Sequence, residues 1–371
     1  MKTALVVGGT AASGLAIVEG LRTRGYEVTI YHRGTHEVDA LLDLEHIHGD
    51  PHHRETIAAD LGQREWDVTV ATYGRTRYLA DALRARTGHF VAISGLPVIS
   101  APLGVPTTEA TPYERPENAP PGLAKILPLI IETEQHIIAA HRDGDFASTV
   151  IRYPYVYGPY AVAPLEWHVI QRAPDRRPRW TVQGGGLAIA ARCAAPNAAE
   201  LVLCALDRPE AAGGQIYNAA DGRQFSQREW VSIIAAACDW EFEFVDVPAS
   251  IAPLGSSSIP LSGEYSWVRR SDVENGILRH QLVDTARARA ELGYRDAVDP
   301  AEWIERTVRH WLANPPLVDG EKGRLGPADF DYAAEDRLLG SWDRAVSGPP
   351  DPGAANVRAH PYDHPKSVKA S

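Results

Sequence analysis

The amino-acid sequence predicts an α/β protein built on a doubly wound parallel sheet. Short apolar runs that suit strands alternate with helix-like segments through residues 1–160. This order is typical of an open parallel sheet with helices on both faces. A glycine-rich loop, GGTAASG, joins the first run to the first helix. The chain has 371 residues, 44% of them hydrophobic, which is enough for two domains or one elaborated domain.

Each predicted element follows from a local pattern. Residues 3–8, TALVVG, form a short Val-rich run of the kind found in buried parallel strands. A helical pattern over residues 14–24 ends at Gly25. The other predicted elements are the strands EVTIYHR, a short run before His48-Gly49-Asp50, WDVTVATYG and HFVAISG, and the late helices TARARAELG and PAEWIERTVRHWL.

The charge and the cysteine content exclude several classes of protein. A net charge of −11 argues against binding to nucleic acid or anionic membranes, because both need a basic surface. Three cysteines without paired spacing fit a reducing compartment. The N-terminus enters a strand directly, and no apolar run is long enough to span a bilayer. We therefore expect a cytoplasmic protein without nucleic-acid or membrane partners.

The glycine loop has the strand–loop–helix context of a dinucleotide-binding fingerprint. Gly8 permits a tight turn, Ala11 is small enough for the backbone to approach a pyrophosphate, and Gly14 allows close helix–strand packing. The helix N-terminus would offer free N–H groups to the phosphates. The alternative is a tight strand–helix turn with no ligand.

The end of the second predicted strand indicates which dinucleotide is bound. An acidic residue there usually meets a free ribose 2′-hydroxyl, whereas an arginine suits a 2′-phosphate. The chain has Arg33 and no Asp or Glu at the strand end, which favours NADP(H), with NAD(H) as the alternative. Arg33 as a solvated surface residue also remains open. Asp50 lies where a carboxylate could accept from the adenine amino group.

The motif RYPYVYGP at residues 152–159 indicates the class of protein more specifically than the glycine loop does. Together with GGTAASG, Gly49-Asp50, Tyr217-Asn218 and the ELGY of residues 291–294, it resembles the extended short-chain dehydrogenase/reductase family, in its NAD(P)-dependent epimerase/dehydratase branch. The resemblance runs from about residue 3 to about residue 315. It implies a Rossmann-type domain and a smaller C-terminal substrate domain that share one cleft. It also implies a homodimer, formed by two helices that pack as a bundle.

The resemblance divides the chain into three parts. We expect residues 1–160, with returning segments at about 190–225, to bind the dinucleotide, and residues 161–315 to form mainly the substrate domain. Residues 316–371 lie outside the resemblance and form a polar tail with a disordered end. Its amphipathic piece, DFDYAAEDRLLGSW, would dock on the body or on a partner subunit. The Pro-rich stretch 100–122 is expected to be a long functional or mobile loop.

The family's proton-transfer pair is missing from this chain. In the family, a tyrosine moves the hydroxyl proton, and a lysine four residues later supports it from the same helix face. Alignment of Glu134 with the family's acidic residue places these two positions at Ile126 and Ile130. The family serine position falls on Gly95, with Ser94 beside it.

Four residues are candidates to replace the missing pair: Ser94, Tyr155, Tyr73 and Lys125. The position of Ser94 makes it the best candidate for proton transfer, because it lies at the end of a strand that faces the site. Tyr155 and its neighbour Tyr157 could equally be packed tyrosines, and Tyr73 could line the cofactor. Lys125 points about 100° away from the lost tyrosine position. Glu132 and Glu134 are expected on a solvated face or in helix pairs.

The cofactor contacts expected from the loop, the strand ends and the resemblance are made by Gly8, Thr10, Ala11, Ser13, Gly14, Arg33, Asp50, Tyr73, Gly74 and Pro154. No metal is expected, because the spacing of His46, His48, His52 and His53 matches no standard site. His168 is a weaker candidate for general acid/base chemistry.

The substrate side departs from the nucleotide-sugar enzymes of the family. Their acidic pair is replaced by Pro196-Asn197, which argues against a nucleotide-diphosphate sugar. Ile126, Ile130, Leu96 and Pro97 would make the catalytic wall apolar. An arginine cluster is expected to be a solvated loop, or alternatively to grip an anionic substrate; its members are Arg172, Arg176, Arg177 and Arg179.

The sequence thus predicts an NADP(H)-dependent oxidoreductase that acts on a small, fairly apolar carbonyl or alcohol without the usual Tyr/Lys pair. One alternative is a non-redox isomerase, epimerase or lyase on the same fold. Another is a catalytically inactive protein that senses NADP(H) or acts as a scaffold.

Overall fold

A seven-stranded, wholly parallel sheet forms the centre of the computed structural model, which describes residues 2–99, 105–119, 121–248, 251–252, 259–261, 271, 275–318, 325 and 327–347. The strand order is β10-β6-β5-β4-β1-β2-β3, and this confirms the predicted α/β class. The strands are β1 (Lys2–Val7), β2 (Tyr26–His32), β3 (Glu45–His48), β4 (Trp66–Ala71), β5 (Thr87–Gly95), β6 (Ala147–Tyr153) and β10 (Gln215–Asn218).

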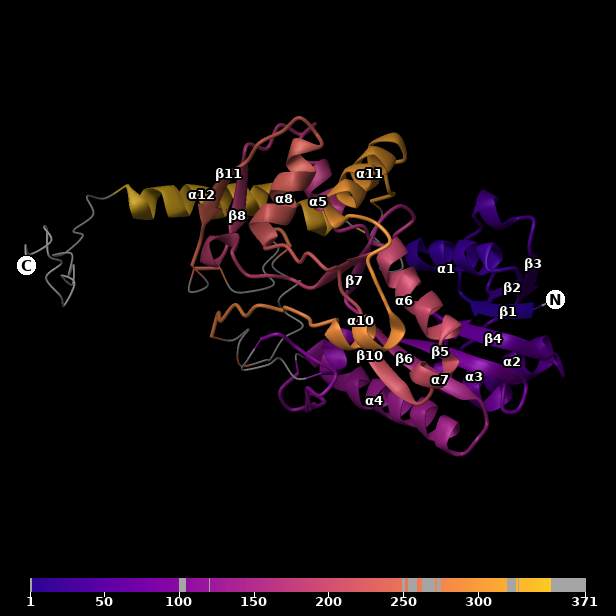
Figure 1. The fold of residues 1–371 in the computed structure, drawn as a ribbon. Coiled ribbons are helices and arrows are strands. Elements are labelled where there is room, and N and C mark those ends of the chain that lie inside the picture. Colours follow the sequence, from indigo (N-terminus) through magenta and orange to yellow (C-terminus); the bar gives the residue numbers. More distant parts are fainter. Residues whose placement is uncertain are drawn as a thin grey trace, which may run out of the picture.

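Helices cover both faces of this sheet (Figure 1). The helices α1 (Ala12–Thr23) and α6 (Ala195–Asp207) pack on one face, and α2 (Arg54–Leu61), α3 (Thr76–Ala82) and α4 (Pro121–Arg142) lie on the other. Side chains of a strand alternate between the faces. Ala4 and Val6 of β1 therefore join the core under α1 and α6, while Leu5 and Val7 join the opposite core. This double burial explains why residues 4–7 of the strand are all apolar.

The C-terminal part of the chain builds a second core beside the sheet (Figure 1). Trp180 and Trp230 are fully buried in it. Its elements are α5 (Glu166–Ile170), β8 (Arg179–Val182), α8 (Gln227–Ala236), β11 (Glu243–Asp246) and α11 (Pro300–Ala313), with the small β7–β9 pair (Tyr155–Tyr157 and Arg192–Ala194) at the junction. The other elements of the described residues are α7 (Pro209–Ala212), α10 (Ala286–Leu292), and the short 3-10 turns η1 (Asp39–Leu41), η2 (Leu96–Val98), η3 (Gly184–Gly186) and η5 (Pro327–Phe330).

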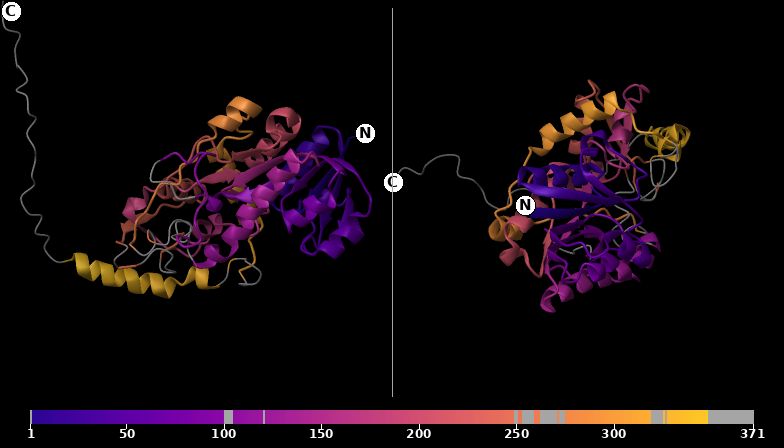
Figure 2. Two further views of the ribbon diagram at one scale, coloured as in Figure 1. Left: turned by 90° about the horizontal axis from the view of Figure 1, so that it is seen from below. Right: turned by 90° about the vertical axis from the view of Figure 1, so that its right-hand side faces the viewer.

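The tail contributes one helix, α12 (Tyr332–Val346), which extends along the outer side of the C-terminal part (Figure 2). The predicted docking of the tail on the body is confirmed for this helix, because three arginines of the body hold it. Arg172 pairs with Glu335, Arg177 with Asp336, and Arg179 with Asp343. The expected disordered end of the tail lies outside the described residues.

The arginine cluster therefore differs from the solvated loop expected from the sequence. Arg172 is fully buried, so that expectation is wrong for this residue. Arg177 and Arg179 are half-buried in their ion pairs, and Arg176 is exposed. The charged acceptors come from α12, a segment more than a hundred residues away in the chain, which the local pattern could not reveal.

No helix among the described residues combines the length and the apolar character that a membrane span requires.

Candidate functional site

The glycine loop connects β1 to α1 in the geometry that a phosphate-binding turn needs. Gly8 and Gly9 have positive φ angles of 98° and 85°, a conformation that glycine adopts without steric cost. A Cβ atom on Gly8 would lie only 2.4 Å from Thr72 Oγ1. The glycine is thus required both by its backbone angle and by the close approach of the end of β4.

The start of α1 leaves backbone donors available. Ala11 is the N-cap residue, and no described side chain bonds to the N–H groups of the first turn as a cap. These groups point out of the helix and carry a partial positive charge. A Cβ atom on Gly14 would come within 2.6 Å of the Gly9 backbone, so Gly14 lets the helix pack on the loop. Thr10 and Ser13 are half-buried beside this turn.

Polar residues gather where β2, β3 and β4 end. The guanidinium of Arg33 lies over the Tyr73 ring, with 5.4 Å between Cζ and the ring centroid. The carboxylate of Asp50 accepts from the backbone N–H of His52 at 3.0 Å and contacts its Nδ1 at 2.7 Å. These bonds from His52 hold the pKa of Asp50 below its ordinary value. Gly74 packs against Pro51, and a Cβ atom there would lie 2.7 Å from the proline ring.

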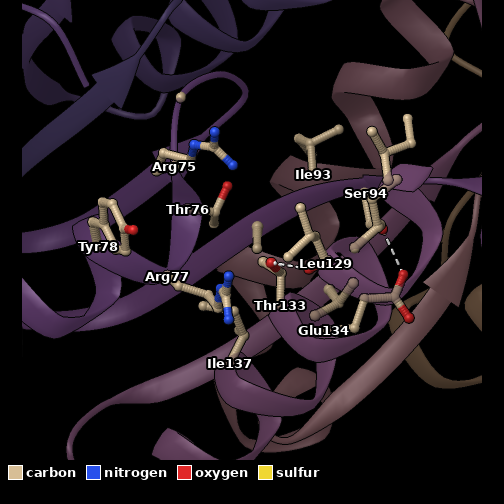
Figure 3. Close-up of a pocket in the computed structure, with 15 residues that line it drawn as sticks. Arg75, Thr76, Arg77, Tyr78, Ile93, Ser94, Leu129, Thr133, Glu134 and Ile137 are labelled. Carbon is tan, nitrogen blue, oxygen red and sulfur yellow. Dashed lines mark hydrogen bonds between the residues drawn. The ribbon is translucent and has the colours of Figure 1, made fainter. Parts of the chain in front are cut away.

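A pocket of about 230 Å³ lies between the start of α3, the end of β5 and α4 (Figure 3). Ser94 lines it from β5, and Ile126 and Ile130, which the sequence analysis aligns with the family's proton-transfer positions, line it from α4. Gly74 contributes from the loop after β4. Ile126 and Ile130 give this pocket an aliphatic side, whereas the other two residues of the predicted apolar wall, Leu96 and Pro97, are not among its lining residues. The two isoleucine side chains cannot exchange a proton.

Ser94 is bonded to a buried carboxylate. Its hydroxyl donates to Glu134 Oε1 at 2.5 Å (Figure 3). Glu134 also accepts from Arg152 Nη2 at 2.7 Å and from the Tyr113 hydroxyl at 2.9 Å. The side chain of Glu134 is 1% exposed and that of Arg152 is 3% exposed. Burial, followed by the charge of Glu134, raises the pKa of Tyr113 to about 12.

The expectation that Glu134 lies on a solvated face is wrong. The side chain faces the ends of β5 and β6, where Arg152 compensates its charge. Glu132, two residues earlier on α4, is exposed and pairs with Arg77. A two-residue step on a helix changes the direction of a side chain by about 200°, and this explains the difference between the two glutamates.

The other sequence candidates are not among the residues that line the Ser94 pocket. Lys125 is exposed and does not line the pocket. The Tyr155 hydroxyl donates to Glu166 Oε2 at 2.9 Å, and the Tyr157 hydroxyl donates to Asp221 Oδ2 at 2.9 Å. Half-buried Pro154 precedes these tyrosines. His168 is buried on Phe330, and burial lowers its pKa to about 4.

Tyr113 and Arg152 belong to the Ser94 network although the sequence did not single them out. Tyr113 lies in the stretch 100–122 and is brought to the sheet by a bridge to Ile99. Arg152 is the first residue of the RYPYVYGP motif. Its partner Glu134 lies on α4, and the two meet because α4 packs on β6. The arrangement brings a hydroxyl, a carboxylate and a guanidinium together next to an aliphatic wall.

The class of protein follows from this fold and from comparison with known proteins. The model of the NAD dependent epimerase/dehydratase family matches residues 4–220. The chain belongs to this family, as the sequence motifs implied. Comparison with curated proteins finds no match.

Solved structures of this family share the fold. UDP-glucose 4-epimerase from Thermotoga maritima has a TM-score of 0.65 and 18% identity, over 84% of this chain and 99% of its own. dTDP-glucose 4,6-dehydratase from Bacillus anthracis, in complex with NAD, has a TM-score of 0.62 and 15% identity, over 85% and 97% of the two chains. The Streptomyces venezuelae dTDP-glucose 4,6-dehydratase, also bound to NAD, has a TM-score of 0.62 and 21% identity, over 84% and 97%.

Proposed function

We propose that the chain binds a nicotinamide dinucleotide in the cleft that begins at the glycine loop. The positive φ angles of Gly8 and Gly9, the free N–H groups at the start of α1 and the absence of a Cβ atom at Gly14 all fit a pyrophosphate there. The family's name and the NAD complexes of the two dehydratases support the same group. Arg33, Asp50, Tyr73 and Gly74 would form the adenosine end, with Pro154 at the nicotinamide end.

Arg33 favours NADP(H) over NAD(H), because an exposed guanidinium next to the expected ribose suits a 2′-phosphate. The test is a titration with NADPH, NADH and their oxidised forms. Arg33→Ala is expected to weaken NADPH binding by roughly 10- to 100-fold, the range of a charged hydrogen bond, and to leave NADH binding unchanged. Arg22→Ala removes a surface arginine paired with Asp43 and serves as the matched control.

Two outcomes would contradict the cofactor assignment. Equal NADPH binding by wild type and Arg33→Ala would make Arg33 a solvated surface residue. If no dinucleotide binds at all, GGTAASG is only a turn.

The reaction that this site supports best is hydride transfer on a small, fairly apolar carbonyl or alcohol. The observation that carries this proposal is the bond from Ser94 to buried Glu134 beside the wall of Ile126 and Ile130. A pocket of about 230 Å³ suits a small molecule better than a nucleotide-diphosphate sugar. A bound nicotinamide would accept or supply the hydride.

Ser94 would handle the proton in this reaction. In the oxidation direction, Ser94 Oγ takes the proton of the substrate hydroxyl while its own proton passes to the Glu134 carboxylate. The C–H bond breaks with its electron pair, a C=O bond forms, and one proton remains on Glu134. Reduction runs through the same atoms in reverse. Arg152 and Tyr113 hold the carboxylate in place through their hydrogen bonds.

A panel of aliphatic and aromatic carbonyls and alcohols tests this step through the absorbance of the reduced nicotinamide. Ser94→Ala is expected to lower kcat by about 100- to 10,000-fold, the range of general acid/base catalysis, with an unchanged Kd for the dinucleotide. Ser94→Thr retains a hydroxyl and should retain measurable turnover. A Ser94→Ala variant with wild-type kcat would remove Ser94 from the mechanism.

Isoleucine at both family proton-transfer positions also supports a second candidate, an NADP(H)-responsive binding protein without catalysis. Tight binding of one redox state, with no turnover on the panel, would favour it. The non-redox isomerase, epimerase or lyase would instead convert a substrate with no net change in the nicotinamide absorbance.

We also propose that the protein is a homodimer. The family resemblance supports this assembly, because it implies a dimer formed by two helices that pack as a bundle. Sedimentation equilibrium measures the mass in solution directly, and a monomer would contradict this proposal.

A further inference from the structure

Three histidines come together on one face of the sheet where β2 and β3 end. His32, the last residue of β2, is the register partner of His48 in β3. His46 lies two residues before His48 on the same strand, so the two side chains point to the same face. The three ring centroids are separated by 5.0, 5.1 and 5.9 Å.

A carboxylate from the β2–β3 connection closes the group. Glu37 Oε1 lies 3.6 Å from His32 Nε2 and 3.3 Å from His48 Nε2, and its Oε2 lies 3.5 Å from His46 Nδ1. One ligand atom from each of the four residues fits within a span of 4.8 Å. Ligands about 2.0–2.2 Å from a tetrahedral zinc ion lie roughly 3.3–3.5 Å from one another, close to the separations from Glu37.

His46 is oriented for metal binding by a bond on its far side. Its Nε2 lies 2.8 Å from the carbonyl oxygen of Leu41. A carbonyl can only accept, so Nε2 carries the proton and Nδ1 presents a lone pair to the centre of the group. At 2.8 Å, His32 Nε2 donates to this lone pair in the metal-free chain. A metal ion bound to both nitrogens would replace this proton, which is released to solvent. A backbone carbonyl behind a ligating imidazole is a usual feature of protein metal sites.

We propose that His32, Glu37, His46 and His48 bind one divalent transition-metal ion, with Zn²⁺ the best match to three imidazoles and one carboxylate. Magnesium and calcium prefer all-oxygen ligand sets. Buried His32 anchors the inner side of the site, while the side chains of His48 and Glu37 are 59% and 37% exposed. The ion can therefore enter from solvent.

The ion would stabilise the chain next to the proposed adenosine end of the cleft. Glu37 and Leu41 belong to the connection that follows Arg33, whereas the histidines belong to the two strands. A metal ion would tie this connection to the sheet and so position Arg33. The sequence expectation of no metal rested on local spacing, and the pairing of β2 with β3 is what assembles these four residues.

The experiment is a titration of tag-free protein with Zn²⁺ in competition with a chromophoric chelator. Wild type is expected to bind one equivalent. His46→Ala and His48→Gln should each weaken binding by more than about 100-fold, because even outer-shell partners usually contribute 10- to 100-fold. His53→Ala, at a histidine that is 66% exposed and outside the group, should bind as wild type does.

Two results would overturn the proposal: no Zn²⁺ bound by wild type, or wild-type affinity in both ligand variants. His48→Gln changes an exposed side chain, so its thermal unfolding without metal should match wild type. Zn²⁺ should raise the Tm of wild type but not that of His48→Gln. Gly14→Ala, which targets the dinucleotide loop, should still bind Zn²⁺. The metal site and the cofactor assignment can therefore fail independently.

Discussion

Arg172 and Glu335 form a buried ion pair although 163 positions separate them in the chain. The Arg172 side chain is fully buried and that of Glu335 is 4% exposed. Arg172 also donates to the carbonyl of His168 and lies over the rings of Trp180, Phe330 and Tyr332. The tail helix α12 is thereby a structural part of the C-terminal core.

Removing one partner of this pair should destabilise the protein strongly. Glu335→Ala leaves the Arg172 charge buried without its carboxylate, which typically costs about 3–5 kcal/mol. Denaturant unfolding of the full chain measures the loss. The matched control is Asp343→Ala, which breaks the more exposed pair with Arg179 and should cost at most about 1 kcal/mol. Equal effects of the two variants would show that α12 does not depend on the buried pair.

The carboxyl group of Glu166 should make stability depend on pH. It is fully buried, and this burial raises its pKa from 4.5 to about 7. The folded state then keeps a proton that the unfolded chain releases, so this residue's contribution to stability falls as pH rises from about 4.5 to about 7. Glu166→Gln should gain up to about 3 kcal/mol relative to wild type across this window. Unfolding free energies at about pH 5 and about pH 7 measure the gain.

Tyr155→Phe provides the control for this prediction. It removes the hydrogen bond to Glu166 but keeps the buried carboxyl group, so the fall in stability between about pH 4.5 and about pH 7 should persist. A Glu166→Gln variant with the same pH dependence as wild type would contradict the raised pKa.

Gly14→Ala should abolish dinucleotide binding through sterics alone. The added Cβ would lie 2.6 Å from the backbone of Gly9, so the loop must move away from the start of α1. Gly122→Ala in α4 is the matched control, because nothing lies within 4 Å of its Cβ position. This control should gain about 0.5–1 kcal/mol of stability from helix propensity and keep full binding. NADPH titration and thermal unfolding of both variants distinguish local displacement of the loop from global unfolding.

Features set by local patterns could be predicted from the sequence. The run TALVVG is buried on both faces, and the helix predicted over residues 14–24 begins slightly earlier, at Ala12, directly after the glycine loop. The assignment of the family's proton-transfer positions to Ile126 and Ile130 stays a prediction, which rests on their fixed spacing from Glu134 on one helix.

Features that depend on distant pairings could not be predicted in this way. Glu134 matched a family position, but its burial depends on Arg152 arriving on β6. His32 and His48 meet only because β2 and β3 pair in that register. The local sequence around Arg172 predicts a basic, solvated loop, because its partner Glu335 comes from the distant tail helix. In each case a charged or polar side chain is buried by a partner that local periodicity does not reveal.

Pro196-Asn197, which the sequence analysis aligns with the family's acidic pair, leads to the last prediction. Asn197 is fully buried, and its Nδ2 donates to Asp221 Oδ1 at 2.7 Å. Its Oδ1 accepts from the backbone N–H of Val298 at 2.9 Å. Asn197 thus joins the loop after β10 to the segment before α11, and it needs both a donor and an acceptor. Burial raises the pKa of Asp221 to about 6.

Asn197→Asp would place a second carboxyl group against Asp221, so that one of the two must stay protonated. The folded state would then hold a proton that the unfolded chain releases, and stability should fall as pH rises above the unfolded value of about 4. We expect a loss of at least about 1–3 kcal/mol at about pH 8, with partial recovery at about pH 5. Asn197→Ala removes one hydrogen bond that holds the pKa of Asp221 down but adds no carboxyl group, so its loss should grow less with pH than that of Asn197→Asp. Wild-type stability of Asn197→Asp at about pH 8 would mean that the junction accepts two carboxylates, and the asparagine would then have no structural reason to replace the family's acid.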